Sequence, residues 1–151
     1  MSIDTSAKIR VVADTNIFVA AALKPGGPTE MWLRIAGQPR SSFELFVSEP
    51  ILEELREKLV HKFSFSAERV KAFIGAIRER ATVVNPASHL ELGVIRDPDD
   101  RMILECALEA HAHLIISADQ DLLLLNPFRG NGITHPRELK NIFRSDLPKS
   151  S

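Results

Sequence analysis

The 151-residue sequence has a single cysteine, almost no net charge and no long hydrophobic run. With Cys106 alone, no intramolecular disulfide can form, which excludes a disulfide-stapled scaffold. The longest apolar run, residues 17–23, is far shorter than the roughly 20 residues that span a bilayer. Residues 1–10 also lack an apolar core of signal-peptide length. We therefore expect a cytoplasmic protein without a membrane segment.

The balance of charge is also informative, because 19 basic and 20 acidic residues leave a net charge of −1. A module that only binds nucleic acid would carry a strongly basic face, and the sequence gives no sign of one. The five histidines show no zinc-binding spacing with cysteine, and residues 25–28 lack the Lys-Ser/Thr pair of a P-loop. An enzyme with a local basic rim is still compatible with this composition.

Short apolar runs alternate with helical patterns along the chain, which indicates an α/β fold. We expect a central, mainly parallel sheet flanked by helices on both faces. The predicted domain spans residues 8–144, with loose tails at 1–7 and 145–151. The predicted strands are residues 9–13, 43–47, 82–84, 114–117 and 133–135, and the predicted helices are 15–23, 28–36, 49–61, 67–80, 98–111, 121–125 and 136–143.

Two carboxylates directly follow predicted strands. Asp14 comes after the first strand and Asp119 comes just after the fourth. In parallel α/β sheets, ligands bind beyond the carboxyl ends of the strands. Each acid also has a purely structural explanation, because Asp14 can cap the helix at Thr15, Asp119 can serve a turn, and Asp121 can cap the next short helix.

The segment Asp97-Pro98-Asp99-Asp100 reads as a helix start. Asp97 suits the N-cap, and anions in the first turn are favoured by the helix dipole. Asp100 fits this explanation less well, because it stands three and four residues before Ile103 and Leu104 and so lies on the core-facing stripe. An inward carboxylate is costly unless it is paired or binds a metal ion.

Glu54 lies at the edge of the apolar stripe of the helix predicted at residues 49–61. It is either a solvated partner of Lys58 at i,i+4 or a ligand at the edge of a pocket. Asn16, two residues after Asp14, is either a polar first-turn residue or an amide that orients a phosphate.

Carboxylates that converge repel one another and raise each other's pKa, so a convergent set usually needs a cation. Oxygen ligands without cysteine favour Mg²⁺ or Mn²⁺ over zinc. These ions commonly serve phosphoryl chemistry. The pattern therefore predicts a metal-dependent reaction at a phosphate.

These segments, in this order, resemble a PIN-domain ribonuclease, and in particular bacterial PIN proteins assigned as toxins of toxin–antitoxin pairs. The matching pieces are residues 11–16, Ser48 with 51–59, residues 97–100 and residues 115–123. The resemblance implies a Mg²⁺- or Mn²⁺-dependent ribonuclease. Its expected partners are an RNA substrate, an antitoxin protein and a second copy of the chain.

The resemblance also implies roles for individual residues. The catalytic acids are Asp14, Glu54, Asp100 and Asp119, and the metal ligands are these four with Asp97 and Asp121. Asn16 and Ser117 are the expected substrate-orienting residues, with Ser117 standing where the family often has threonine. We expect Asp14, Asp100 and Asp119 to hold an ion that activates water, and Glu54 to complete the shell or accept a proton.

Two other functions are compatible with parts of the pattern. One is a non-catalytic PIN-like module that binds RNA or protein, although the complete set of acids argues against it. The other is a phosphatase or phosphotransferase with Asp14 as nucleophile, which would normally need a second Asp where Asn16 stands. Cations that could offset the acidic pocket towards RNA are Arg34, Arg40, Lys62, Arg69, Arg96 and Arg101.

Overall fold

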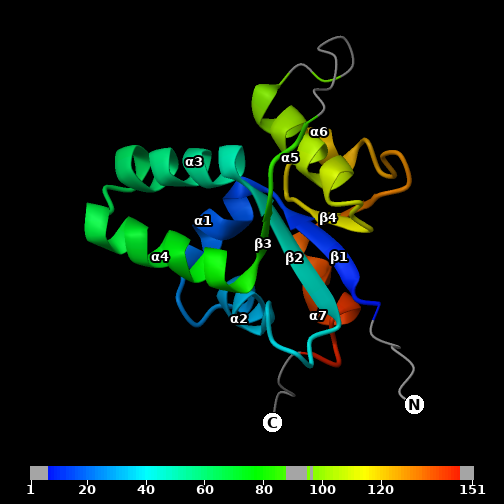
Figure 1. Ribbon diagram of the computed structural model, residues 1–151, viewed down its shortest axis with the longest axis horizontal. Coiled ribbons are helices and arrows are strands. Elements are labelled where there is room, and N and C mark those ends of the chain that lie inside the picture. The colour runs from blue at the N-terminus through cyan, green and yellow to red at the C-terminus, as the bar shows by residue number, and fades with distance from the viewer. Residues whose placement is uncertain (1–6, 88–94, 96, 147–151) are drawn as a thin grey trace.

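Five parallel strands form one sheet in the computed structural model, which describes residues 7–87, 95 and 97–146. The order is β3-β2-β1-β4-β5, so β1 lies at the centre between β2 and β4 (Figure 1). The strands are β1 Ile9–Ala13, β2 Phe43–Ser48, β3 Thr82–Val84, β4 Leu114–Ile116 and β5 Gly132–Thr134. The predicted parallel α/β architecture is confirmed. Most of the predicted tails lies outside the described residues, and the domain bounds stay a prediction.

Within the described residues, seven α-helices connect and cover these strands. They are α1 Thr15–Leu23, α2 Pro28–Ile35, α3 Glu49–Glu57, α4 Ala67–Arg80, α5 Pro98–Glu109, α6 Gln120–Leu123 and α7 Leu139–Ile142. From β1 the chain first builds the sheet outward to β3 and then, on the other side of β1, outward to β5. Because crossovers between parallel strands are right-handed, α1–α4 lie on one face of the sheet and α5–α6 on the other. Figure 1 shows α3 and α4 on one side of the sheet and α5 on the other. None of the described helices is long and apolar enough to cross a membrane.

The predicted element positions agree closely with the structure, and the differences lie at the ends of elements: three strands differ by one residue at one or both ends, and the larger differences are in helices. The helix predicted to run to residue 61 ends at Glu57 and continues as a π-helical turn, Lys58–Lys62. The last predicted helix is divided into a 3-10 turn, Pro136–Glu138, and α7. The wider turn at Lys58–Lys62 matters for the site, because it contains the lysine that reaches back towards α1.

Three helices begin at carboxylates that cap them. Asp14 accepts a hydrogen bond from the Asn16 N–H at the start of α1, and Asp97 accepts one from the Asp99 N–H at the start of α5. Asp119 accepts from two backbone N–H groups at the start of α6. An Asp at the N-cap satisfies donors that the first helical turn leaves free and also favours the helix dipole. Three helix starts therefore each carry an acid of the predicted site.

The hydrophobic core includes a group of three aromatic rings, contributed by α2, by β2 and by the residue that follows α7. The rings of Trp32 and Phe43 are stacked with centroids 4.9 Å apart, and the ring of Phe143 lies 4.7 Å from that of Phe43. All three side chains are fully buried. Phe143 immediately follows α7, so this contact attaches the C-terminal helix to α2 and β2.

We predict that Phe143→Ala lowers the free energy of unfolding by about 3 kcal/mol or more, because it leaves a cavity beside two rings. Urea unfolding followed by circular dichroism measures this. The neighbouring Ile142 is 39% exposed, so Ile142→Ala should cost well under half as much. Equal losses for the two variants would show that the aromatic group does not anchor α7.

Candidate active site at the carboxyl edge of the sheet

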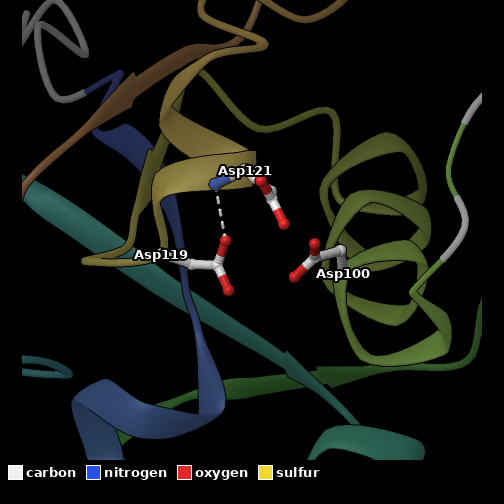
Figure 2. Close-up of side chains that lie close together, drawn as sticks. All are labelled: Asp100, Asp119 and Asp121. Carbon is white, nitrogen blue, oxygen red and sulfur yellow. Dashed lines mark hydrogen bonds between the residues drawn. The ribbon is translucent and has the colours of Figure 1, made fainter.

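Three aspartates converge where α5 approaches the start of α6. Asp100, Asp119 and Asp121 each offer a carboxylate oxygen, and these atoms all lie within 4.8 Å of one another. Figure 2 shows the three carboxylates directed towards a common space, with Asp100 coming from α5 and the other two from the start of α6. Acids from two segments of the chain therefore form one oxygen-rich site.

Asp14 joins this site through a buried hydroxyl. Ser117 donates a hydrogen bond of 2.7 Å to Asp14 Oδ2 and accepts one of 2.9 Å from the Asp119 N–H. The Ser117 side chain is fully buried and Asp14 is 8% exposed. These contacts with two acids, rather than a contact with RNA, are what the structure shows for Ser117. Its expected role in orienting substrate stays a prediction.

The environment of Asp14 acts in two directions. Burial raises the pKa of the Asp14 carboxyl, and the nearby charge of Asp119 raises it further. The hydrogen bonds from Ser117 and from the Asn16 N–H lower it, as does the charge of Lys58. The buried carboxylate is thus held in place by donors that favour its ionised form.

Asp100 is the most strongly perturbed carboxyl of the site. Burial, followed by the charges of Asp119, Asp97, Asp14 and Asp121, raises its pKa to about 7. Its side chain faces inward as its position on α5 predicts, with 7% of the residue exposed. These four predicted metal ligands are therefore close enough to Asp100, the fifth, to raise its pKa. The roles of all five as ligands stay predictions.

Glu54 borders the site from α3. Its Oε1 lies 3.3 Å from Lys58 Nζ. Burial raises the Glu54 pKa, hydrogen bonding with Asp99 adds to the rise, and Lys58 opposes it. Glu54 is therefore a partner of Lys58 and also a partly buried carboxylate near another acid, and its role as a ligand stays a prediction.

The sequence predicts Lys58 only as the partner of Glu54 at i,i+4, and the structure gives it a second contact. Lys58 Nζ donates a 3.1 Å hydrogen bond to Asn16 Oδ1, 42 positions earlier in the chain. The spacing from Glu54 was a visible signal, but only the packing of α3 against α1 brings the ammonium to Asn16. Asp99 was likewise read only as a first-turn anion, and its contact with Glu54 was not expected.

Two arginines expected to offset the acids lie elsewhere. Arg34 forms an ion pair with Glu30, and Arg34 and Arg69 both line a groove between α2 and α4. Arg96 lies outside the described residues. A cation that the structure does place beside Glu54 and Asn16 is Lys58, and for Arg40, Lys62 and Arg101 the role of offsetting the acids stays a prediction.

Comparison with known proteins agrees with this geometry. A family model described as a PIN domain matches residues 10–121, more than half of the chain. The chain belongs to the PIN domain family. It is 30% identical over 122 residues to the uncharacterized protein MJ1680 of Methanocaldococcus jannaschii, covering 78% of this chain and 76% of that protein.

The fold comparison covers almost the whole chain. The crystal structure of PAE2754 from Pyrobaculum aerophilum matches with a TM-score of 0.57 over 95% of this chain and 96% of that one, at 10% sequence identity. At this identity the match establishes the shared fold only.

PIN domains are typically metal-dependent nucleases, and this donor set fits a hard divalent cation. The converging groups are carboxylates, which suit Mg²⁺ and Mn²⁺. Burial and, after it, the charges of the neighbouring acids raise the pKa of Asp100, and a cation among these acids would relieve their repulsion. The geometry therefore suits the binding of a divalent cation among these carboxylates.

The raised pKa of Asp100 predicts how stability depends on pH in the presence of a chelator. The folded pKa of about 7 lies above the ordinary value of 3.8. Between these values the folded state keeps a proton that the unfolded chain has lost, so stability falls as the pH rises from about 4 to about 7. Above pH 7 the loss is complete.

We therefore predict that Asp100→Asn is more stable than wild type at pH 7.5 in chelator, by on the order of 2 kcal/mol. Near pH 4 the two proteins should melt at similar temperatures, and added Mg²⁺ should narrow the gap at pH 7.5 by stabilising wild type. Glu53→Gln, at a 63% exposed side chain on α3, is the control and should change little. An Asp100→Asn protein that melts lower at pH 7.5 would mean that Asp100 acts as a stabilising first-turn anion.

Proposed function

We propose that this PIN domain is a Mg²⁺- or Mn²⁺-dependent ribonuclease and the toxin component of a toxin–antitoxin pair. The observation that carries the proposal is the convergence of Asp100, Asp119 and Asp121 beside the buried, hydrogen-bonded Asp14. A non-catalytic binding module would have no need to keep a strongly perturbed inward carboxyl such as Asp100.

In this proposal, Asp14, Asp100 and Asp119 hold the ion, with Asp97, Asp121 and Glu54 around them. A bound Mg²⁺ or Mn²⁺ supplies Lewis-acid stabilisation of the charge that develops on the phosphate. The protein's contribution is orientation, because Ser117 and the helix caps fix Asp14 and Asp119 before any ligand arrives. Glu54, whose pKa is raised by burial, accepts a proton from the attacking water.

Asn16 is proposed to orient a phosphate of the substrate. It is exposed, lies in the first turn of α1, and its side-chain oxygen is fixed by Lys58. The amide nitrogen of the same side chain is then directed away from the lysine and can donate to an anion.

We predict that the purified protein cleaves single-stranded RNA with Mg²⁺ or Mn²⁺, and that Asp14→Asn lowers the rate by at least about 100-fold. Asparagine is also a favoured N-cap, so this change removes charge while keeping the start of α1. A gel assay with and without chelator measures the rate, and Glu53→Gln should cleave like wild type. If wild type and Asp14→Asn cleave equally, the acids do not carry the activity.

An antitoxin partner is proposed to bind a groove that lies away from the acids. The groove has a volume of about 620 Å³ and lies between the last turn of α1, helix α2 and the length of α4. Its apolar lining includes Leu33 and Phe73, and its charged residues are Arg34, Arg69 and Arg80 with one acid, Glu30. This chemistry suits an amphipathic helix of the partner with apolar and acidic side chains. A homodimer also stays a prediction.

Ala76 is an exposed residue of α4 that lines this groove. If a small reading frame beside this gene encodes the partner, we predict that Ala76→Trp weakens binding of that protein by at least tenfold, about 1.4 kcal/mol, because the ring fills the groove. Isothermal titration calorimetry with the purified partner measures the affinity. Lys71→Ala, at another exposed position of α4, is the control, and RNA cleavage without the partner should be unchanged in both. Unchanged affinity, or no binding to wild type, would contradict this partner and its site.

A further inference from the structure

We propose that Lys58 is a built-in cation that takes the place of a second metal ion at the Glu54 end of the acidic pocket, where it binds a phosphate of the substrate. The part of this inference that concerns substrate rests on the proposed ribonuclease function. The part that concerns metal binding does not, because it can be measured without RNA.

The position of Lys58 is fixed from two elements. Its Nζ lies 3.3 Å from Glu54 Oε1, on the preceding helix, and 3.1 Å from Asn16 Oδ1, in the first turn of α1. A lysine ammonium has three N–H donors, and the hydrogen bond to Asn16 uses one of them while the Glu54 carboxylate lies nearby as counter-ion. Within the described part of the chain, the ammonium therefore keeps donor capacity for an anionic ligand that enters the pocket.

The ammonium is also unusually sheltered for a surface ion pair. The Lys58 side chain is 27% exposed and that of Glu54 is 16% exposed. The adjacent pair on the same helix, Arg56 and Glu53, has side chains that are 45% and 63% exposed. Pairs of the exposed kind contribute little and hold no fixed geometry. The Lys58 pair is partly shielded from water and joined to α1, so its charge has a defined place.

The charge of Lys58 divides the pocket into two unlike halves. Among the described residues, the group of at least three acids placed to share a cation is Asp100, Asp119 and Asp121, and Glu54, whose neighbouring acid is Asp99, lies outside this group. Glu54 already has the ammonium as its counter-ion. A divalent ion at Glu54 would have to break this pair and would lie beside a like charge, which disfavours its binding.

Lys58 also acts on the acid at the centre of the site. Burial raises the pKa of both Asp14 and Glu54, and the charge of Lys58 acts against this rise at each carboxyl. This arrangement gives the site a positive charge for phosphate at one end and acids for a metal ion at the other. Phosphate binding by lysine as a point charge is common in proteins.

The metal-binding test is a Mn²⁺ titration of the full chain without RNA, followed by electron paramagnetic resonance of the free ion. We expect one Mn²⁺ per chain for wild type and for Lys58→Arg, which keeps the charge. Lys58→Met should bind a second Mn²⁺, because Glu54 loses its counter-ion. Lys58→Gln is the second neutral variant if Lys58→Met does not fold by circular dichroism. Two ions on wild type, or one ion on the neutral variants, would overturn the proposal.

The activity test asks whether metal ion can replace the lost lysine. At a Mn²⁺ concentration that just saturates wild type, Lys58→Met should cleave single-stranded RNA about 100-fold more slowly. A large excess of Mn²⁺ should restore much of this loss in Lys58→Met and have little effect on wild type. Lys71→Met, at an exposed lysine of α4, should match wild type at both concentrations.

The outcomes separate the two proposals. Full activity of Lys58→Met at low Mn²⁺, or a loss that excess Mn²⁺ does not reduce, would contradict the role of Lys58 as a substitute cation. If no protein cleaves RNA, including wild type, the ribonuclease proposal fails, and the Mn²⁺ count still decides whether Lys58 excludes a second ion.

Discussion

The hydroxyl of Ser117 connects the parts of the site, and its position depends on the pairing of β1 with β4. The Asp14 N–H donates to the Ile116 carbonyl at 2.9 Å, which extends the pairing by one residue beyond the strands. Ser117 then donates to the Asp14 carboxylate and accepts from the Asp119 N–H. One buried side chain therefore fixes two acids that lie more than 100 positions apart in the chain. The caps of α1 and α6 follow from the same arrangement, because these acids also begin those helices.

The inward carboxyl of Asp100 lowers the stability of the folded protein, so its presence is better explained by function. The crossover from β3 to β4 carries α5 to the other face of the sheet, where it packs against β1 and β2. Its first turn thereby brings Asp100 to Asp119 and Asp121. Burial and four neighbouring acids raise its pKa to about 7, so the folded protein resists ionising a group that the unfolded chain ionises freely. Strain of this kind is expected at sites that are shaped for a ligand.

The pocket is chemically asymmetric. Around Asp100 the groups that meet are carboxylates, and a cation is needed to relieve their repulsion. Around Glu54 the chain supplies its own positive charge from Lys58, held by Asn16. The π-helical turn Lys58–Lys62 begins at this lysine, directly after α3 ends. The two halves therefore differ in what they can bind, and Asp14 lies under the influence of both.

The sequence by itself determined the elements and the candidate acids. Local signals were sufficient for this, because caps such as Ser48 and Ser66 and the apolar stripe of α4 act within a few residues. The inward direction of Asp100 also followed from its spacing to Ile103 and Leu104. Family resemblance, carried by four ordered segments, then gave the expected site.

Only the tertiary structure decided how these acids are connected. The order of the strands, the burial of Ser117 between Asp14 and Asp119, and the reach of Lys58 to Asn16 all join residues far apart in the chain. Such contacts depend on how whole helices and strands pack, and no local pattern of residue types encodes the distance between two side chains. Spacing along α3 could show that Lys58 lies near Glu54, but the packing of α3 against α1 made it part of the site.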